Sequence, residues 1–196
     1  SDDLLMAGAV RSAVHALEAQ PDAGMVYADG LMVDRQGQLL DPHYYRHYSL
    51  LDLLCFEVLL QPTAFMRHQA LEAVGYLREG YDLILDHELW VRLAARYPLV
   101  HVREFWAVER SHPQAKTLAE AASFVQEADQ LIADAKRTSG LSELISTHAR
   151  RVQASLDAFA ARRLIDAGDY TSALKRLSHS LGKHPGVALL YWYKWL

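Results

Sequence analysis

The sequence has almost no cysteine, no long apolar run and no signal-like start. Cys55 is the single cysteine among 196 residues, so the chain cannot form an internal disulfide, and a reducing compartment is expected. No stretch reaches the ~20 consecutive apolar residues of a membrane-spanning helix. Residues 1–3 lack the basic and apolar regions of a signal peptide. We therefore expect a soluble, cytoplasmic protein, and peripheral contact with the inner face of a membrane stays open.

The charge balance lacks a positive excess. The chain has 24 acidic and 20 basic side chains, a net charge of −4 and a pI near 6.2. A protein that holds nucleic acid needs basic surface to neutralise phosphates, so no nucleic-acid partner is expected. With 51% hydrophobic and 22% charged residues, the composition is that of a globular protein. The length suits one α/β domain with a smaller appendage.

Residues 1–115 show a mixed pattern of helices and strands. Apolar residues three or four positions apart predict helices, and short runs rich in β-branched residues predict strands. The expected helices are 4–20, 50–54, 68–74 and 86–97, and the expected strands are 24–29, 31–34, 61–66 and 99–110. A turn at 35–38 before Leu39 predicts a hairpin. The pattern predicts an α/β domain with a mixed sheet and packed helices.

Residues 116–196 are helical in pattern almost throughout. Breaks are expected at Ser139-Gly140 and at residues 167–169, and Pro185 precedes a last apolar helix. The residues Gly168, Asp169, Tyr170, Ala173, Leu177 and Pro185 stand where one tetratricopeptide unit has its small, aromatic and proline residues. Because such repeats stack in groups of about three or more, an ordinary helical hairpin is the alternative. The second domain, 116–196, is thus an all-helical extension.

Three clusters of residues could carry chemistry. Adjacent carboxylates at Asp2 and Asp3 suit a hard divalent cation, or they cap the helix expected at Leu4. Asp86 opens a helix, where it acts either as a general base at a cleft edge or as a cap that interacts with the helix dipole. The last cluster joins residues 110–112 with Lys116. Its cationic groups suit phosphate oxygens and its histidine suits a metal, although a lone histidine also serves structure or solvent.

Five segments, in this order, resemble the inverting family-2 glycosyltransferases, enzymes of the GT-A fold that move a sugar from a nucleotide diphosphate to an acceptor. The segments are SDDLLMAGAV (1–10), PDAGMVYADGLMVDRQGQLL (21–40), QPTAFMRHQALEAVGYL (61–77), DHELWVRLA (86–94) and ERSHPQAKT (109–117). Together they span roughly residues 1–120. The resemblance implies transfer with inversion from a nucleotide-diphosphate sugar to a saccharide or lipid-linked acceptor, in the synthesis of cell-surface polysaccharide or glycoconjugate.

By this resemblance, the aspartate pair and the late basic motif hold the donor. Asp3 is expected to ligate Mn²⁺ or Mg²⁺, and Asp2 to contact the sugar or ribose of the donor. Arg110 and Lys116 are expected to bind the diphosphate, and His112 to complete the metal shell. The cation would neutralise charge on the departing diphosphate.

The acceptor side is expected around the helix that Asp86 begins. By resemblance, Asp86 is the catalytic base that deprotonates the acceptor hydroxyl. Gln61, Tyr81, Glu88 and Trp90 are candidate acceptor-binding residues. Glu88 has at most a supporting role, because residues two apart on a helix do not share a face.

The sequence departs from the family in one respect. In the family, a nucleotide-binding region of alternating strands and helices precedes the aspartate motif, whereas here Ser1 stands at the motif. Without those first strands, apolar sheet edges would be uncovered. We therefore expect the chain to be the metal- and acceptor-binding half of such a domain, and expect that it does not turn over alone.

Two other functions are compatible with parts of the sequence. The helical residues after 115 end in an aromatic segment, 191–196, which suits a non-catalytic binding module if the rings are exposed; packing against the preceding helices is the alternative. A metal-dependent hydrolase would need a further ligand cluster. His43, His47 and His68 lack the helical i,i+4 spacing that would supply one.

Overall fold

The computed structural model describes residues 3–110 and 121–192, apart from the side chains of residues 121, 191 and 192. The chain divides into two compact units. The α/β unit contains the described residues of 3–50, 58–79 and 85–110, and the helical unit contains 51–57, 80–84 and 121–192. The two units are therefore not the two consecutive stretches expected on either side of residue 115, because two short segments of the first stretch pack with the helices.

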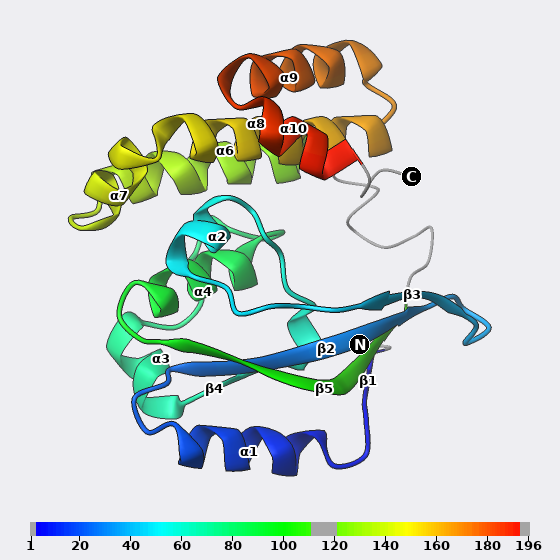
Figure 1. Cartoon of the computed structure of the whole chain (residues 1–196), viewed down its shortest axis with the longest axis vertical. Coiled ribbons are helices and arrows are strands. Elements are labelled where there is room, and N and C mark those ends of the chain that lie inside the picture. Colours follow the sequence, from blue (N-terminus) through cyan, green and yellow to red (C-terminus); the bar gives the residue numbers. More distant parts are fainter. Residues whose placement is uncertain (1–2, 111–120, 193–196) are drawn as a thin grey trace. The chain divides into compact units, whose positions relative to one another are not determined.

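A mixed five-stranded sheet forms the centre of the α/β unit (Figure 1). Its strands are β1 (Leu4–Leu5), β2 (Met25–Val33), β3 (Leu39–His43), β4 (Ala64–Met66) and β5 (Leu99–Arg110). The order is β1-β5-β2-β3, and β4 also pairs with β2. The β2 and β5 strands are parallel, and the remaining pairs are antiparallel. The predicted α/β class with a mixed sheet is confirmed, as is the hairpin that joins β2 to β3.

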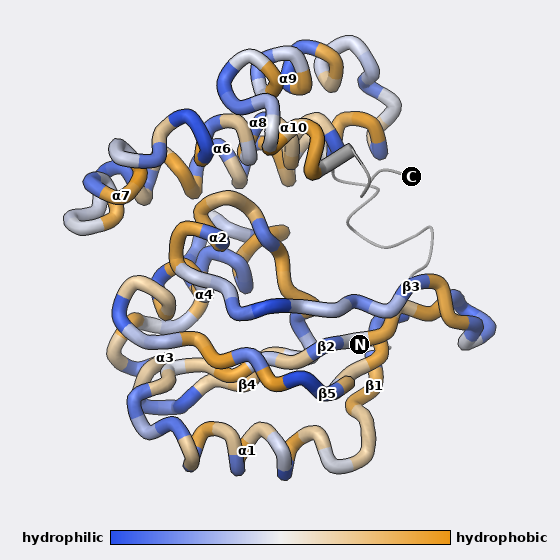
Figure 2. Tube along the Cα trace, in the orientation of Figure 1, coloured by the Kyte–Doolittle hydropathy of each residue, from blue (hydrophilic) through white to orange (hydrophobic). Residues whose placement is uncertain are grey.

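Helices and a short 3-10 turn accompany this sheet. They are α1 (Ala9–Ala19), η1 (Gln61–Thr63), α3 (His68–Val74) and α4 (Leu85–Ala94). The small side chains of Ala9 and Ala13 let α1 lie against the sheet, where Val26, Ala28 and Trp106 complete a buried cluster. Polar residues alternate with these apolar ones along α1 (Figure 2), as expected for a helix with one buried face.

The structure corrects three of the predicted elements. The helix expected from Leu4 begins at Ala9, because Leu4 and Leu5 pair with β5 and Gly8, at φ 90°, ends that extended segment. Asp3 therefore does not cap α1. The two strands expected over 24–34 are the single strand β2, and the segment 61–66 is a 3-10 turn followed by a short strand. The predictions for 50–54, 68–74 and 99–110 are confirmed.

The helical unit is built from long helices with an alanine-rich core. Its elements are α2 (Leu50–Leu54, all but the first residue), α6 (Ala121–Arg137), α7 (Leu141–Thr147), α8 (Ala149–Asp166), α9 (Tyr170–Lys183) and α10 (Pro185–Trp192). Ala154 and Ala158 of α8 pack against Val187 of α10. The predicted breaks are confirmed, since Gly140 and Gly168 both have positive φ values between helices.

An ionic cluster around the buried Asp157 joins three of these helices. The guanidinium of Arg176 on α9 donates to Asp157 of α8 and to Asp129 of α6. Ala173 is buried in the same helix, whereas Tyr170 is 69% exposed. The hairpin of α8 and α9 thus packs through small residues, and a tetratricopeptide role for it stays a prediction.

Within residues 3–110 and 121–192, no helix is long and apolar enough to cross a membrane.

Candidate functional site

Strand pairing brings Asp3 beside Arg110. Leu4 lies opposite Val108 in the antiparallel β1·β5 pair, and the Asp3 carboxylate accepts a hydrogen bond from the backbone N–H of Arg110 at 3.3 Å. These residues are 107 positions apart, and the family resemblance implies a metal-ligating role for Asp3 and a diphosphate-binding role for Arg110. Their proximity therefore places a carboxylate and a guanidinium at the carboxyl end of β5.

The Arg110 side chain is anchored by the neighbouring hairpin. One of its terminal nitrogens donates to the carbonyl oxygens of Asp34 and Arg35 at 3.1 and 3.0 Å. The Asp34 carboxylate in turn accepts the N–H groups of Gln36 and Gln38, which fixes the turn. A guanidinium has five N–H donors, and within the described residues only one of the Arg110 nitrogens has a side-chain hydrogen bond. The remaining donors suit an oxyanion.

The carboxylate of Asp3 fits a divalent cation only in part. Among residues 3–110 and 121–192, no three His, Cys, Asp or Glu side chains gather closely enough to hold a metal. Mg²⁺ and similar ions often take one or two carboxylates and complete their shell with phosphate oxygens and water. A single carboxylate beside an arginine that has N–H donors left for phosphate oxygens has that donor chemistry. The other predicted ligands of donor and metal, Asp2, His112 and Lys116, lie outside the described residues.

Asp86 lies in the first turn of α4. Its carboxylate accepts the backbone N–H of His87 at 2.7 Å, so it interacts with the amino end of its own helix. Burial raises the pKa of Asp86 above that of an ordinary aspartate, and the bonds to first-turn N–H groups only partly offset this effect. No ion pair to Asp86 occurs in the described part of the chain. A desolvated carboxylate without a cation has a raised proton affinity, which suits a general base.

Glu88 has a structural environment. Its carboxylate is held by Arg92 of the same helix through three contacts of 2.7–2.9 Å, and Arg78 lies 3.2 Å away. Arg92 also donates to the carbonyl oxygens of Val74, Gly75 and Tyr76. These carbonyls lie at and just after the carboxyl end of α3, where carbonyl groups have no hydrogen-bond partner within the helix. The Glu88–Arg92 pair therefore joins α3 to α4, and a supporting role for Glu88 in acceptor binding stays a prediction.

The other predicted acceptor residues differ in accessibility. Gln61 is exposed at the start of η1. Trp90 is 0% exposed, and Tyr81 is 5% exposed, with its hydroxyl donating to Asp134 at 2.7 Å. In this structure neither aromatic ring faces solvent, so neither is available to stack on a sugar. An acceptor role for these residues stays a prediction, and Gln61 is the accessible one.

Sequence reasoning missed a buried polar network that holds the loop after β3. Asp29 stands at an irregularity in the β2·β5 pairing, and its carboxylate contacts His101 and the backbone N–H of Tyr45, each at 2.8 Å. The Tyr27 hydroxyl donates to the carbonyl of Arg46 and accepts the N–H of Tyr48. The signal available in the sequence was an aspartate that interrupts the apolar run 25–28.

This network leaves one tyrosine of the loop exposed. The Tyr45 hydroxyl accepts the N–H of Leu60, and burial of this phenol raises its pKa. Tyr44 next to it is 70% exposed and contacts the ring of Phe105 edge-on at 5.4 Å. The hydrogen bond between Tyr45 and Leu60 thus anchors the loop, while the side chain of Tyr44 is exposed to solvent.

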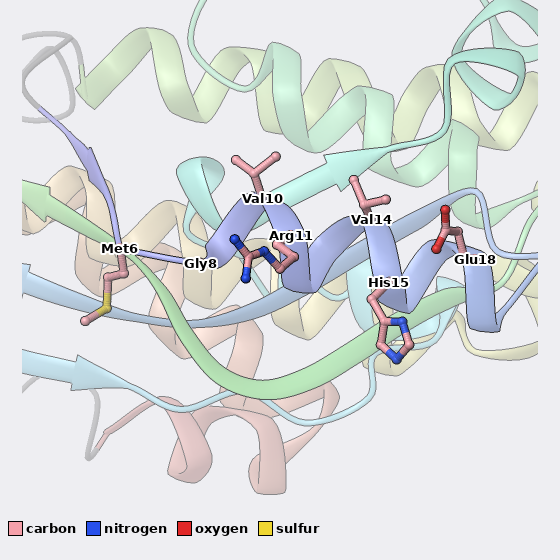
Figure 3. A pocket seen from close by; sticks show the side chains of 7 residues that line it. All are labelled: Met6, Gly8, Val10, Arg11, Val14, His15 and Glu18. Atoms are coloured by element: carbon pink, nitrogen blue, oxygen red, sulfur yellow. The ribbon is translucent and has the colours of Figure 1, made fainter.

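A surface hollow lies along the outer side of α1 and contains none of the predicted site residues. Val10 and Val14 project from one side of that helix (Figure 3) and are 52% and 49% exposed. The hollow is lined by Met6, Gly8, Val10, Arg11, Val14, His15 and Glu18. Leu4 and Leu5 of β1 are also more than half exposed.

Part of the chain is similar in sequence to a protein of known name. No family model matches the chain. Over 119 residues the chain is 31% identical to a protein named O-antigen biosynthesis protein RfbC from Myxococcus xanthus. The matched stretch covers 57% of this chain and 9% of that protein. The chain therefore spans less than a tenth of the length of this relative.

Proposed function

We propose that this chain is part of a glycosyltransferase that moves a sugar from a nucleotide-diphosphate donor to an acceptor hydroxyl with inversion, in the synthesis of a surface polysaccharide. The observation that carries the proposal is the placement of Asp3 against Arg110. The family resemblance assigns both residues to the donor diphosphate, and β1·β5 pairing brings them together from opposite ends of the α/β unit. The name of the similar Myxococcus protein supports the polysaccharide role.

The proposed division of labour follows from the local environments. Arg110, held by the β2–β3 turn, offers N–H donors to phosphate oxygens. Asp3 would hold Mn²⁺ or Mg²⁺ together with those oxygens, and the cation would supply charge neutralisation. Asp86, whose carboxylate is desolvated, would accept the proton of the acceptor hydroxyl. The exposed Gln61 and Tyr44 are candidates for contacts with the acceptor.

Calorimetric titration of Mn²⁺, alone and with UDP, tests the diphosphate site on the chain as it stands. We expect saturable binding of Mn²⁺ that UDP strengthens, and loss of this coupling in Asp3→Ala and in Arg110→Ala. Asp22→Ala removes an exposed aspartate of the same unit and serves as the matched control. If Asp3→Ala binds Mn²⁺ and UDP as the wild type does, Asp3 and Arg110 do not form the proposed site.

A transfer assay tests the role of Asp86. Because the chain is not expected to turn over alone, the assay uses it joined to a nucleotide-binding region of the kind that precedes the aspartate motif in the family. With nucleotide sugars as donors and release of nucleoside diphosphate as the readout, Asp86→Asn should lower the rate by roughly 10²–10⁴, the usual contribution of a general base. Binding of Mn²⁺ with UDP should be unchanged in this variant, because Asp86 is assigned to the acceptor. Full activity of Asp86→Asn would exclude it as the base.

A further inference from the structure

The loop after β3 carries an aromatic ring that is exposed and yet held in place. Tyr44 directly follows β3 and is 70% exposed. Because β2 lies between β3 and β5, the Tyr44 side chain crosses β2 to meet Phe105 of β5. The two ring planes are at 66°, with their centroids 5.4 Å apart. Such an edge-to-face contact covers at most one face of the tyrosine, so the other face is open to solvent.

An irregularity in the sheet brings Phe105 to this position. Ala28 of β2 pairs with Val102 of β5. The next residue of β2, Asp29, pairs with Phe105, so β5 has two extra residues at this point. Irregularities of this kind re-aim a side chain and are common beside active sites. Phe105 therefore stands next to Asp29, the residue that also holds the loop.

The backbone beside Tyr44 is fixed by a buried pair of side chains from the sheet. The Asp29 carboxylate accepts the N–H of Tyr45 at 2.8 Å and contacts the imidazole of His101 at the same distance. The side chains of Asp29 and His101 are only 9% and 6% exposed. A buried carboxylate needs hydrogen-bond partners, and His101 supplies one that keeps Asp29 directed at the loop. The chain is thus anchored at the residue next to Tyr44.

A sugar ring suits an exposed tyrosine that is held in this way. A pyranose has a face of C–H groups, which the negative face of an aromatic ring attracts. Tyrosine offers a large contact area at a low cost in conformational entropy, and fixing the ring beforehand lowers the cost of binding further. Phe105 precedes Arg110 by five residues of β5, about 16 Å of extended strand. The ring therefore lies apart from the residues assigned to the diphosphate.

We propose that Tyr44 is a stacking subsite for a sugar ring of the acceptor, and that Asp29 and His101 are positioning residues that hold it there. The inference rests on the proposed function for the identification of the acceptor as a saccharide. The placement of Tyr44 is a property of the α/β unit by itself, to which all of these residues belong.

Variants of the full chain test the subsite with simple glycosides as probes. Tyr44→Ala removes the ring and Tyr44→Phe keeps it. Tyr76→Ala removes a 57% exposed tyrosine of the same unit and is the matched control. The probes are the methyl glycosides of glucose, galactose and mannose. Binding is followed by saturation transfer to the glycoside and by the NMR shifts of the Phe105 ring, which every variant contains.

We expect the wild type to bind at least one glycoside with a Kd on the order of 1 mM, the scale for a ligand of this size. Tyr44→Ala should weaken this binding about five- to tenfold, the contribution of an aromatic contact. Tyr44→Phe and Tyr76→Ala should bind as the wild type does. Equal binding in Tyr44→Ala and the wild type would overturn the inference, and so would a wild type that binds none of the three glycosides.

Two substitutions of His101 separate positioning from simple packing. His101→Ala removes a partner of Asp29, so amide exchange at Tyr45 should become about two to ten times faster and glycoside binding should weaken by a similar factor. His101→Gln, whose amide can donate to Asp29, should restore both. If the two variants weaken binding equally, His101 acts by packing and is not a positioning residue. Tyr44→Ala changes an exposed side chain and tests the subsite even where His101→Ala does not fold.

Titration of UDP with Mn²⁺ distinguishes failure here from failure of the proposed function. The Tyr44 variants should bind UDP as the wild type does, because Asp3 and Arg110 are assigned to the diphosphate. If UDP shifts the Phe105 ring and no glycoside does, Tyr44 stacks on the base of the donor and the inference is wrong. If the glycosides bind as expected and Mn²⁺ with UDP does not, the subsite stands and the proposed diphosphate site fails.

Discussion

The helical unit and the α/β unit each contain a carboxylate that is shielded from water. The carboxylate in the helical unit has an arginine as its partner, whereas the one in the α/β unit accepts backbone N–H groups. In the helical unit, Asp157 is 2% exposed, and Arg176 donates to it at 2.8 Å. In the α/β unit, Asp86 has only N–H groups at the start of its own helix, and its pKa is raised by burial. Burying a charge costs free energy of desolvation; a counter-charge offsets much of that cost, whereas a buried charge without one keeps it.

This difference separates structural acids from functional ones within a single chain. Glu88 belongs with Asp157, because Arg92 and Arg78 neutralise it, although it stands two residues from Asp86. Groups with perturbed proton affinity and no structural counter-ion cluster at functional sites. Among the described acids of α4, Asp86 alone meets this description, so the comparison supports its assignment as the base. Three pairs of substitutions can break or sharpen it.

The largest expected effect concerns the Glu88–Arg92 pair. Arg92→Ala leaves the buried Glu88 carboxylate largely uncompensated and frees three carbonyls at the end of α3. We expect the free energy of unfolding to fall by about 3–5 kcal/mol, measured by urea denaturation with tryptophan fluorescence. Trp90 and Trp106 are both fully buried in this unit and report on it.

Arg96→Ala is the matched control for that experiment. Arg96 is one turn further along the chain, is exposed and donates only to the carbonyl of Ala73. Its removal should cost no more than about 1 kcal/mol. Equal losses in the two variants would mean that the Glu88–Arg92 pair is not a structural ion pair, and the distinction between Glu88 and Asp86 would fail.

The next effect compares packing tightness in the two units. A Cβ at Gly24, before β2, would stand 2.6 Å from the Cβ of Tyr97, whereas one at Gly182 in α9 would meet nothing within 4 Å. Gly24→Ala should therefore destabilise by about 1–3 kcal/mol, and Gly182→Ala should stabilise by about 0.5–1 kcal/mol. Thermal unfolding of both variants checks the signs. A stabilising Gly24→Ala would show that the start of β2 is loosely packed.

Much of the fold could be predicted from local pattern. Residues 68–74 and 99–110 agree with the structure because periodicity and a flanking Gly75 or Pro98 act within a few residues. The helix predicted from Leu4 was wrong because a long-range contact, and not the local pattern, determines the structure there. Its apolar spacing continues that of α1, but pairing with β5, a strand about a hundred residues later, determines its conformation.

The residues of the candidate site likewise divide into those that the sequence identified and those that it could not. Asp3, Arg110 and Asp86 came from the family resemblance, since their separate positions in the chain gave no sign of a shared site. The aspartate that interrupts the apolar run 25–28 draws attention to Asp29, but nothing in the local sequence points to its partner His101, 72 residues away. Burial of Trp90 was predictable from helix periodicity, whereas burial of Tyr81 depends on Asp134 of α6.

The measurement that tests the central comparison most directly is the pH dependence of unfolding for Asp86→Asn and Asp157→Asn. Because the folded state raises the pKa of Asp86, the contribution of this one group to stability is fully present below the ordinary aspartate pKa of about 3.9 and is lost as pH rises through the folded value. Asp86→Asn should thus be more stable than the wild type at pH 7, and this gain should vanish in acid. Asp157→Asn should lose about 1–3 kcal/mol at pH 7. A loss of stability at pH 7 in Asp86→Asn would make its carboxylate a structural group and contradict its assignment as the base.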